Sequence, residues 1–147
     1  MSAARRYAIS NEQERFWLAA EVARQGEACG LDGRRRGALR IVVAELVSNV
    51  VRHGGGGGEL TARGLERGGR RGLEVIVEDR GPGIASVECA LRDGFSEGRD
   101  LTPETPASAR RGLGVGLGAV ARLTSELHIE PRLPAGTRIR VVLWNDR

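Results

Sequence analysis

Hydrophobic and polar residues follow two different periods along this 147-residue chain. Apolar residues recur at helical spacing in the segment after Asn11 and again within residues 34–52, which predicts two helices with one buried face each. Between Leu73 and Val77, by contrast, every second residue is apolar, which is typical of a strand. The chain therefore combines helices with strands.

Local signals predict where these elements begin and end. Asn11, with Glu14 three residues later, forms a capping box that opens the first helix, and the glycine run at 54–58 ends the second. The expected elements are strands over 6–9, 59–63, 72–78, 128–131 and 137–144, and helices after residue 11 and over 34–52, 86–91 and 117–127. Because the helices are grouped and the strands form hairpins, we expect an α/β (α+β) two-layer sandwich rather than a doubly wound parallel sheet.

Composition narrows the class of protein. The length suits one domain, so residues 1–147 are expected to form a single unit. All 23 basic residues are arginines spread along the chain, and aromatic residues make up only 3%, which disfavours nucleic-acid binding. Cys29 and Cys89 lack metal-ligand spacing and are predicted to be buried thiols. No segment is apolar enough to span a membrane, so the cytoplasm is the expected location.

The second expected helix carries polar residues beside its apolar side, which comprises Ala38, Ile41, Val42, Leu46 and Val50. Glu45 and Asn49 are four residues apart, hence on one side of the helix, and His53 continues the row. An amide oxygen can bind Mg²⁺, and a carboxylate can accept a proton from an attacking hydroxyl. Polar groups beside a core need partners, which favours a functional interpretation of Glu45 and Asn49 over a surface stripe. For His53 the two interpretations are balanced.

A second motif, Asp79-x-Gly81-x-Gly83, follows the apolar strand. At the end of that strand the Asp79 carboxylate can accept a hydrogen bond from an exocyclic amine such as that of adenine. Gly81 and Gly83 leave room for a flat base to approach the backbone. By itself the motif is equally consistent with an ordinary turn.

A third motif places glycine at 112, 114, 116 and 118, directly before an expected helix. The free backbone N–H groups and the positive end of the helix dipole suit a polyphosphate. A dinucleotide-binding fingerprint would instead follow the first strand of a βαβ unit, with an acidic residue about 20 residues further on. Here a polar segment precedes the glycines and little chain follows them, so that alternative is rejected.

In this order, and together with Gly136-Thr137, the three motifs resemble those of the GHKL ATPase superfamily over about two-thirds of the chain. Residues 93–96 and 118–123 are most similar to the RsbT-like branch of the anti-sigma and switch serine kinases of the RsbW/RsbT type. The resemblance implies the Bergerat ATP-binding fold, a mostly antiparallel mixed sheet with helices on one face. It also implies a flexible ATP lid at about 94–116, with ATP and Mg²⁺ as cofactors.

The same resemblance assigns roles to individual residues. Glu45 would be the general base, Asn49 would bind Mg²⁺, and Asp79 would read adenine. The other cofactor-binding positions that it implies are His53, Gly81, Gly83, Arg111, Gly112, Leu113, Gly114, Val115, Gly116 and Thr137. The chain has no lysine that could contact a phosphate, so either Arg110 or Arg111 serves instead or both are surface charges of the lid.

The function implied by the resemblance is that of an ATP-dependent protein serine/threonine kinase, acting as a regulatory switch in a sigma-factor or stress-signalling pathway. Its phospho-acceptor would be a STAS-domain protein of the anti-sigma-factor-antagonist kind. The alternative is a nucleotide-dependent binding module that sequesters a sigma factor or activates a PP2C-type phosphatase by contact. The ATPase part of a histidine kinase is disfavoured, because no helical hairpin with an acceptor histidine precedes the pocket.

Overall fold

A five-stranded antiparallel sheet with strand order β1-β2-β3-β7-β6 forms one layer of the molecule. The computed structural model describes residues 3–53, 57–81, 116–132 and 135–145, with the backbone alone of 95–96 and 99–100. The sheet strands are β1 Arg5–Ile9, β2 Gly58–Arg67, β3 Arg70–Asp79, β6 Glu126–Pro131 and β7 Thr137–Trp144. A separate short pairing joins β4 Phe95–Ser96 to β5 Arg99–Asp100.

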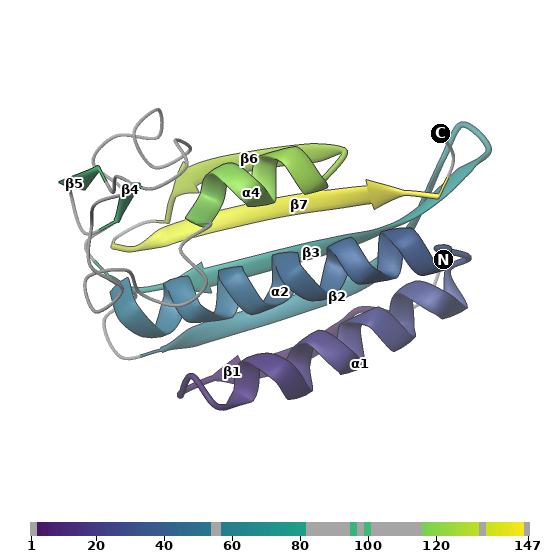
Figure 1. The fold of residues 1–147 in the computed structure, drawn as a ribbon. Coiled ribbons are helices and arrows are strands. Elements are labelled where there is room, and N and C mark those ends of the chain that lie inside the picture. The colour runs from purple at the N-terminus through teal and green to yellow at the C-terminus, as the bar shows by residue number, and fades with distance from the viewer. Residues whose placement is uncertain are drawn as a thin grey trace.

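The described helices cover one face of this sheet, with α2 between α1 and α4 (Figure 1). They are α1 Glu14–Ala28, α2 Gly33–His53 and α4 Gly116–Leu123. The core lies between the layers and includes Leu18, Val22, Leu39, Val43, Val47, Leu60, Leu73, Val75, Ile139 and Val141. The expected two-layer α/β sandwich is therefore confirmed, and all sheet pairings among the described strands are antiparallel.

Three local predictions need correction. Helix α1 begins at Glu14 rather than after Asn11, although Glu14 Oε1 does reach back to the Asn11 N–H at 3.0 Å, as a capping box requires. Helix α4 ends at Leu123 instead of residue 127, because the chain joins β7 as strand β6 from Glu126 onwards. Ile41, assigned to the apolar side of α2, is 41% exposed.

Two other predictions concern the cysteines and the membrane. Cys29 is a buried free thiol, as expected, whereas Cys89 lies outside the described residues. Among the helices that the structure describes, none combines the length and the apolar character that crossing a membrane requires.

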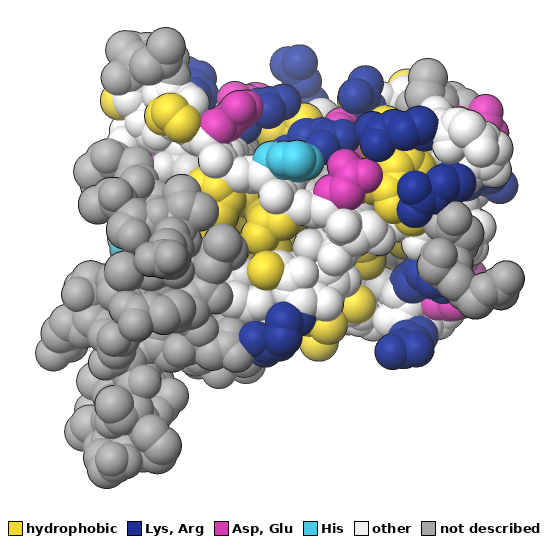
Figure 2. All heavy atoms as spheres, turned by 90° about the horizontal axis from the view of Figure 1, so that it is seen from above, with side chains coloured by type: hydrophobic (Ala, Val, Ile, Leu, Met, Phe, Trp, Pro, Cys, Tyr) yellow, Lys and Arg dark blue, Asp and Glu magenta, His cyan; other side chains and the backbone are white. Residues whose placement is uncertain are grey.

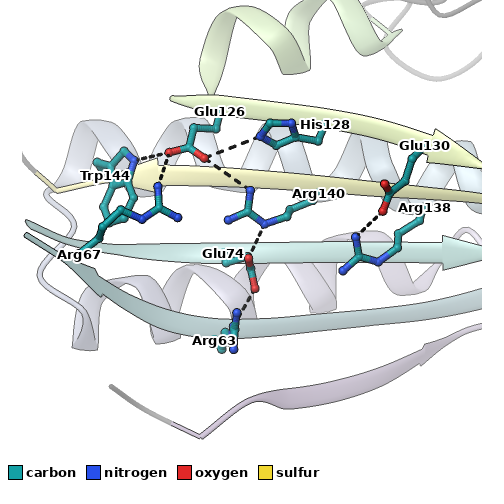
Figure 3. A network of polar contacts seen from close by, with 9 residues as sticks. All are labelled: Arg63, Arg67, Glu74, Glu126, His128, Glu130, Arg138, Arg140 and Trp144. Carbon is teal, nitrogen blue, oxygen red and sulfur yellow. Dashed lines mark hydrogen bonds and ion pairs between the residues drawn. The ribbon is translucent and has the colours of Figure 1, made fainter.

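The other face of the sheet is covered by no described helix and is occupied by charged side chains. Seen from the β6 and α4 side, basic and acidic groups gather along the part of the surface away from the helices (Figure 2). At the centre Glu74, which is 2% exposed, accepts hydrogen bonds from Arg63 and Arg140, which lie on the two neighbouring strands (Figure 3). Glu126 extends the network by accepting the Trp144 indole N–H at 2.9 Å. Ion pairs thus take the place of a second helical layer.

Candidate nucleotide-binding site

The C-terminal half of α2 places polar groups at the border of its buried face. Leu46 and Val50 are fully buried against the sheet, while Glu45 and Asn49 are half-buried beside them. This is the arrangement that their spacing of four residues predicts. His53, the last residue of α2, is exposed, so burial along the row ends before it.

Glu45 is joined to the start of α4. The backbone N–H of Gly116 donates a hydrogen bond to the Glu45 carboxylate, so two segments that are far apart in the sequence meet here. Burial raises the pKa of Glu45 above its ordinary value, against the opposing effects of this N–H and of the nearby Arg52 and Arg15. A partly buried carboxylate with a raised pKa is suited to accept a proton.

Asp79 is fixed at the end of β3 by backbone donors. Its Oδ1 accepts the N–H of Gly81 at 2.9 Å and the N–H of Thr137 at 3.2 Å, and both Asp79 and Thr137 are 5% exposed. Among the residues that the structure describes, no donor reaches Oδ2. One oxygen therefore fixes the side chain, while the other can accept a hydrogen bond from a ligand.

Gly136 brings the start of β7 against Asp79. Its φ is +109°, and a Cβ at this position would lie 1.8 Å from the Asp79 carbonyl oxygen. Only glycine allows both the backbone conformation and this close approach. The Gly136-Thr137 pair thus contacts Asp79 directly, so two segments of the motif set meet at this point.

The helical and strand parts of the site lie at the same end of the sheet. Gly58 is paired with Asp79 across β2 and β3, and a Cβ on Gly58 would be 3.1 Å from the Val50 side chain of α2. Val50, which packs on the Asp79 end of the sheet, directly follows Asn49 in α2. The structure brings Glu45, Asn49, Asp79, Gly81, Gly116 and Thr137 to this end.

Comparison with known proteins identifies the family. The model of the histidine kinase-like ATPase domain matches residues 9–143. The chain belongs to this family. It is also 31% identical over 106 residues to the serine/threonine-protein kinase RsbT of Bacillus subtilis (strain 168), an alignment that covers 72% of this chain and 70% of that protein. The resemblance to GHKL ATPases of the RsbT-like branch is confirmed.

Six of the expected positions of the histidine kinase-like ATPase site lie outside the described residues. They are Gly83, Arg111, Gly112, Leu113, Gly114 and Val115, and Arg110 lies there with them. Their roles stay predictions, as does the short helix expected over 86–91.

A polar cluster beside Glu45 was not found from the sequence. Glu12 Oε1 accepts hydrogen bonds from Arg15 at 3.1 Å, Ser48 at 2.9 Å and Arg52 at 2.8 Å. The Ser48 hydroxyl, first among these effects, holds the pKa of Glu12 below its ordinary value. Ser48 and Arg52 are three and seven residues after Glu45 on α2, which is a signal in the sequence, but Glu12 and Arg15 reach them only through the packing of α1 on α2.

Proposed function

We propose that this protein is an ATP-dependent protein serine/threonine kinase that acts as a regulatory switch. The observation that carries the proposal is the meeting of Glu45 with the start of α4, at the sheet end where Asp79 is held by Thr137. A proton acceptor, a helix N-terminus and a fixed carboxylate that can accept from an exocyclic amine are thereby combined in a histidine kinase-like ATPase domain. This combination suits phosphoryl transfer, which needs positioning and charge neutralisation above all.

The Asp79 end fits an adenine base. Adenine presents an exocyclic N–H donor, and Oδ2 of Asp79 has no described donor, while Oδ1 is already held by Gly81 and Thr137. Because two backbone groups fix the carboxylate, a base that binds there meets an acceptor in a preset position. Thr137 contributes through its backbone N–H, which leaves its hydroxyl as a further group beside the base.

The α4 end fits a phosphate. The N–H groups at the start of a helix attract anions, and in this structure the Glu45 carboxylate takes the Gly116 N–H. A bound phosphate would compete for the same donor. Losing the Gly116 N–H removes one of the contacts that lower the pKa of Glu45, so the carboxylate becomes a stronger base.

Asn49 is the residue that would hold Mg²⁺. Magnesium bound to a nucleotide commonly takes one or two protein ligands and completes its shell with phosphate oxygens and water. A half-buried amide one turn from Glu45 fits that need, and no cluster of three or more His, Cys, Asp or Glu side chains occurs among the described residues. Bound ATP and Mg²⁺ would supply the phosphoryl group and neutralise its charge.

The proposed acceptor is a serine or threonine hydroxyl on a STAS-domain partner. Glu45 would take the hydroxyl proton as the oxygen bonds to the γ-phosphorus and the bond to ADP breaks. The related protein is described as the serine/threonine-protein kinase RsbT, which supports a protein hydroxyl as acceptor. We propose the cytoplasm as location and a sigma-factor or stress-signalling pathway as context.

Calorimetry tests the nucleotide part of this proposal. ATP with Mg²⁺ is titrated into wild type, Asp79→Asn and Asn49→Ala, with Glu130→Gln on the opposite sheet face as matched control. We expect binding that Asp79→Asn abolishes, that Asn49→Ala makes independent of magnesium, and that Glu130→Gln leaves unchanged. Absence of ATP binding to wild type at every magnesium concentration would contradict the kinase and favour a module that acts by contact alone.

A further inference from the structure

A cavity of about 470 Å³ lies between α1 and the outer part of β2, away from the nucleotide site. Its lining includes Arg5, Gln25, Cys29, Leu65, Glu66 and Arg71. The β2 residues that line it are near the β2–β3 turn, whereas Asp79 is paired with Gly58 at the other end of the same hairpin. Six or more residues of extended strand separate the two sites, about 20 Å at 3.3 Å per residue.

Gln25, a buried polar residue that lines this cavity, has an acceptor atom without a donor among the described residues. Gln25 is 7% exposed, and its Nε2 donates to the Ala62 carbonyl oxygen at 3.0 Å. That bond decides the orientation of the amide, because the reversed amide would set two acceptors against each other. Oε1 is thereby turned away from Ala62, and within the described residues it has no hydrogen-bond partner. Burial of an unpaired acceptor is costly, so such a group calls for a ligand or another explanation.

Charged side chains of both signs line the cavity, and only some of them pair with each other. Arg24 and Glu21 pair with each other at 2.9 Å. Among the described residues, Arg5 and Glu66 have no ion-pair partner, and the Arg71 side chain donates only to the Ala28 carbonyl oxygen, at 3.4 Å. Three arginines and two glutamates line the cavity, which leaves one positive charge in excess.

We propose that this cavity binds a small acidic amino acid. Two carboxylates of such a ligand match the guanidinium groups of Arg5 and Arg71, and its ammonium group supplies the donors that Gln25 Oε1 and Glu66 lack. Its net charge of about −1 complements the excess of the lining. Gln25 Oε1 has less than 1 Å² of accessible surface, so the ligand reaches it only when a lining side chain moves. The Arg24 side chain, which is 74% exposed, has room to do so.

The probe is L-glutamate, compared with glutarate, which has the same two carboxylates but no ammonium group. Binding to the full chain is followed by calorimetry and by the side-chain amide signal of Gln25 in ¹⁵N NMR. We expect L-glutamate to bind at least about tenfold more tightly than glutarate, because only glutamate satisfies the buried acceptor. Equal affinities, or no binding of glutamate at millimolar concentration, would overturn the proposal.

Variants separate this site from general charge attraction and from the nucleotide site. Gln25→Leu should remove the preference for glutamate, Arg71→Ala should weaken both probes, and Arg40→Ala, an exposed arginine of α2 outside the cavity, should change neither. Asp79→Asn should retain glutamate binding even though it loses ATP. If Gln25→Leu keeps the preference, the unpaired acceptor does not recognise the ligand and the proposal fails.

Discussion

Glu45 is half-buried and Glu74 is buried, yet the pKa values of the two carboxylates are shifted in opposite directions. On the uncovered sheet face, burial by itself raises the pKa of Glu74, but hydrogen bonds from Arg140 and Arg63 outweigh it, so the net pKa lies below its ordinary value. On α2, burial raises the pKa of Glu45, and the Gly116 N–H and two more distant arginines do not compensate. Glu74, the less exposed of the two carboxylates, is therefore the more firmly ionised one.

The two sites differ in the groups that donate hydrogen bonds to the carboxylate, and this difference distinguishes a structural acid from a functional one. Direct guanidinium bonds neutralise Glu74 and tie three strands together. At the nucleotide site, backbone N–H groups hold Asp79 and Glu45 in place. Oδ2 of Asp79 can still accept a hydrogen bond from a ligand, and the pKa of Glu45 stays raised. A partly buried carboxylate with a raised pKa, as Glu45 has, indicates a candidate functional site.

Glu45→Gln should have the largest effect on function. We expect phosphoryl transfer to fall by about 10²–10⁴-fold, the usual contribution of a general base, with little loss of ATP affinity. Single-turnover transfer from radiolabelled ATP to an acceptor protein that wild type modifies measures this, with Glu130→Gln as control. A variant that transfers at the wild-type rate would remove Glu45 from the role of base.

Glu74→Gln should instead have its effect on stability. Removing one partner of a buried ion pair leaves charge uncompensated, and because Arg63 is 50% exposed we expect a loss near the lower end of the usual range, about 3 kcal/mol. Urea unfolding at pH 7 measures it. Glu130→Gln breaks the exposed pair with Arg138 and should cost less than about 1 kcal/mol. A similar cost for both variants would mean that burial of Glu74 does not matter.

Gly136→Ala probes how backbone contacts hold the acid of the nucleotide site. The positive φ and the close approach to Asp79 make any Cβ unfavourable, so we expect a loss of about 1–3 kcal/mol in unfolding free energy and weaker ATP binding. Gly37→Ala is the control, because a Cβ there meets no atom within 4 Å and helix propensity predicts stabilisation of up to about 1 kcal/mol. Unchanged ATP affinity in Gly136→Ala would show that Asp79 does not depend on this contact.

The pH dependence of the unfolding free energy should show the smallest effect, but it contrasts Glu45 with Glu74 most directly. A lowered pKa stabilises the folded state above the unfolded pKa, and this contribution of Glu74 is lost as pH falls through its folded pKa. A raised pKa does the reverse: the cost of ionised Glu45 is present above its folded pKa and is relieved as pH falls through it. Unfolding free energies of wild type and the two Gln variants should therefore converge toward acid pH from opposite sides. Curves that converge from the same side would contradict the comparison.

Local sequence signals predicted much of the fold, because the patterns that define α2 and β7 lie within each element. Strand β7 spans Thr137–Trp144 as expected, and α2 extends only one residue beyond the predicted helix at each end. The predicted end of α4 was wrong, because Glu126 pairs with Val142 on β7 and this pairing outweighs helical propensity. That competition depends on a neighbouring strand and has no local signature.

The candidate site was predictable to about the same extent as the fold. Glu45 with Asn49 and Asp79 with Gly81 are pairs within one element or turn, so spacing alone placed them together. The bond from Gly116 to Glu45 and the cluster around Glu12 join elements that are distant in the sequence. Only the packing of α1, α2 and α4 on the sheet brings these groups into contact.

By itself, the sequence determined the types and order of the elements, the motif set and the family to which the chain belongs. The tertiary structure decided which carboxylate becomes structural and which stays reactive. Composition cannot distinguish Glu45 from Glu74, because both are glutamates beside apolar neighbours. Desolvation and the distance to charged or N–H donors set their pKa values, and these are properties of the packed chain.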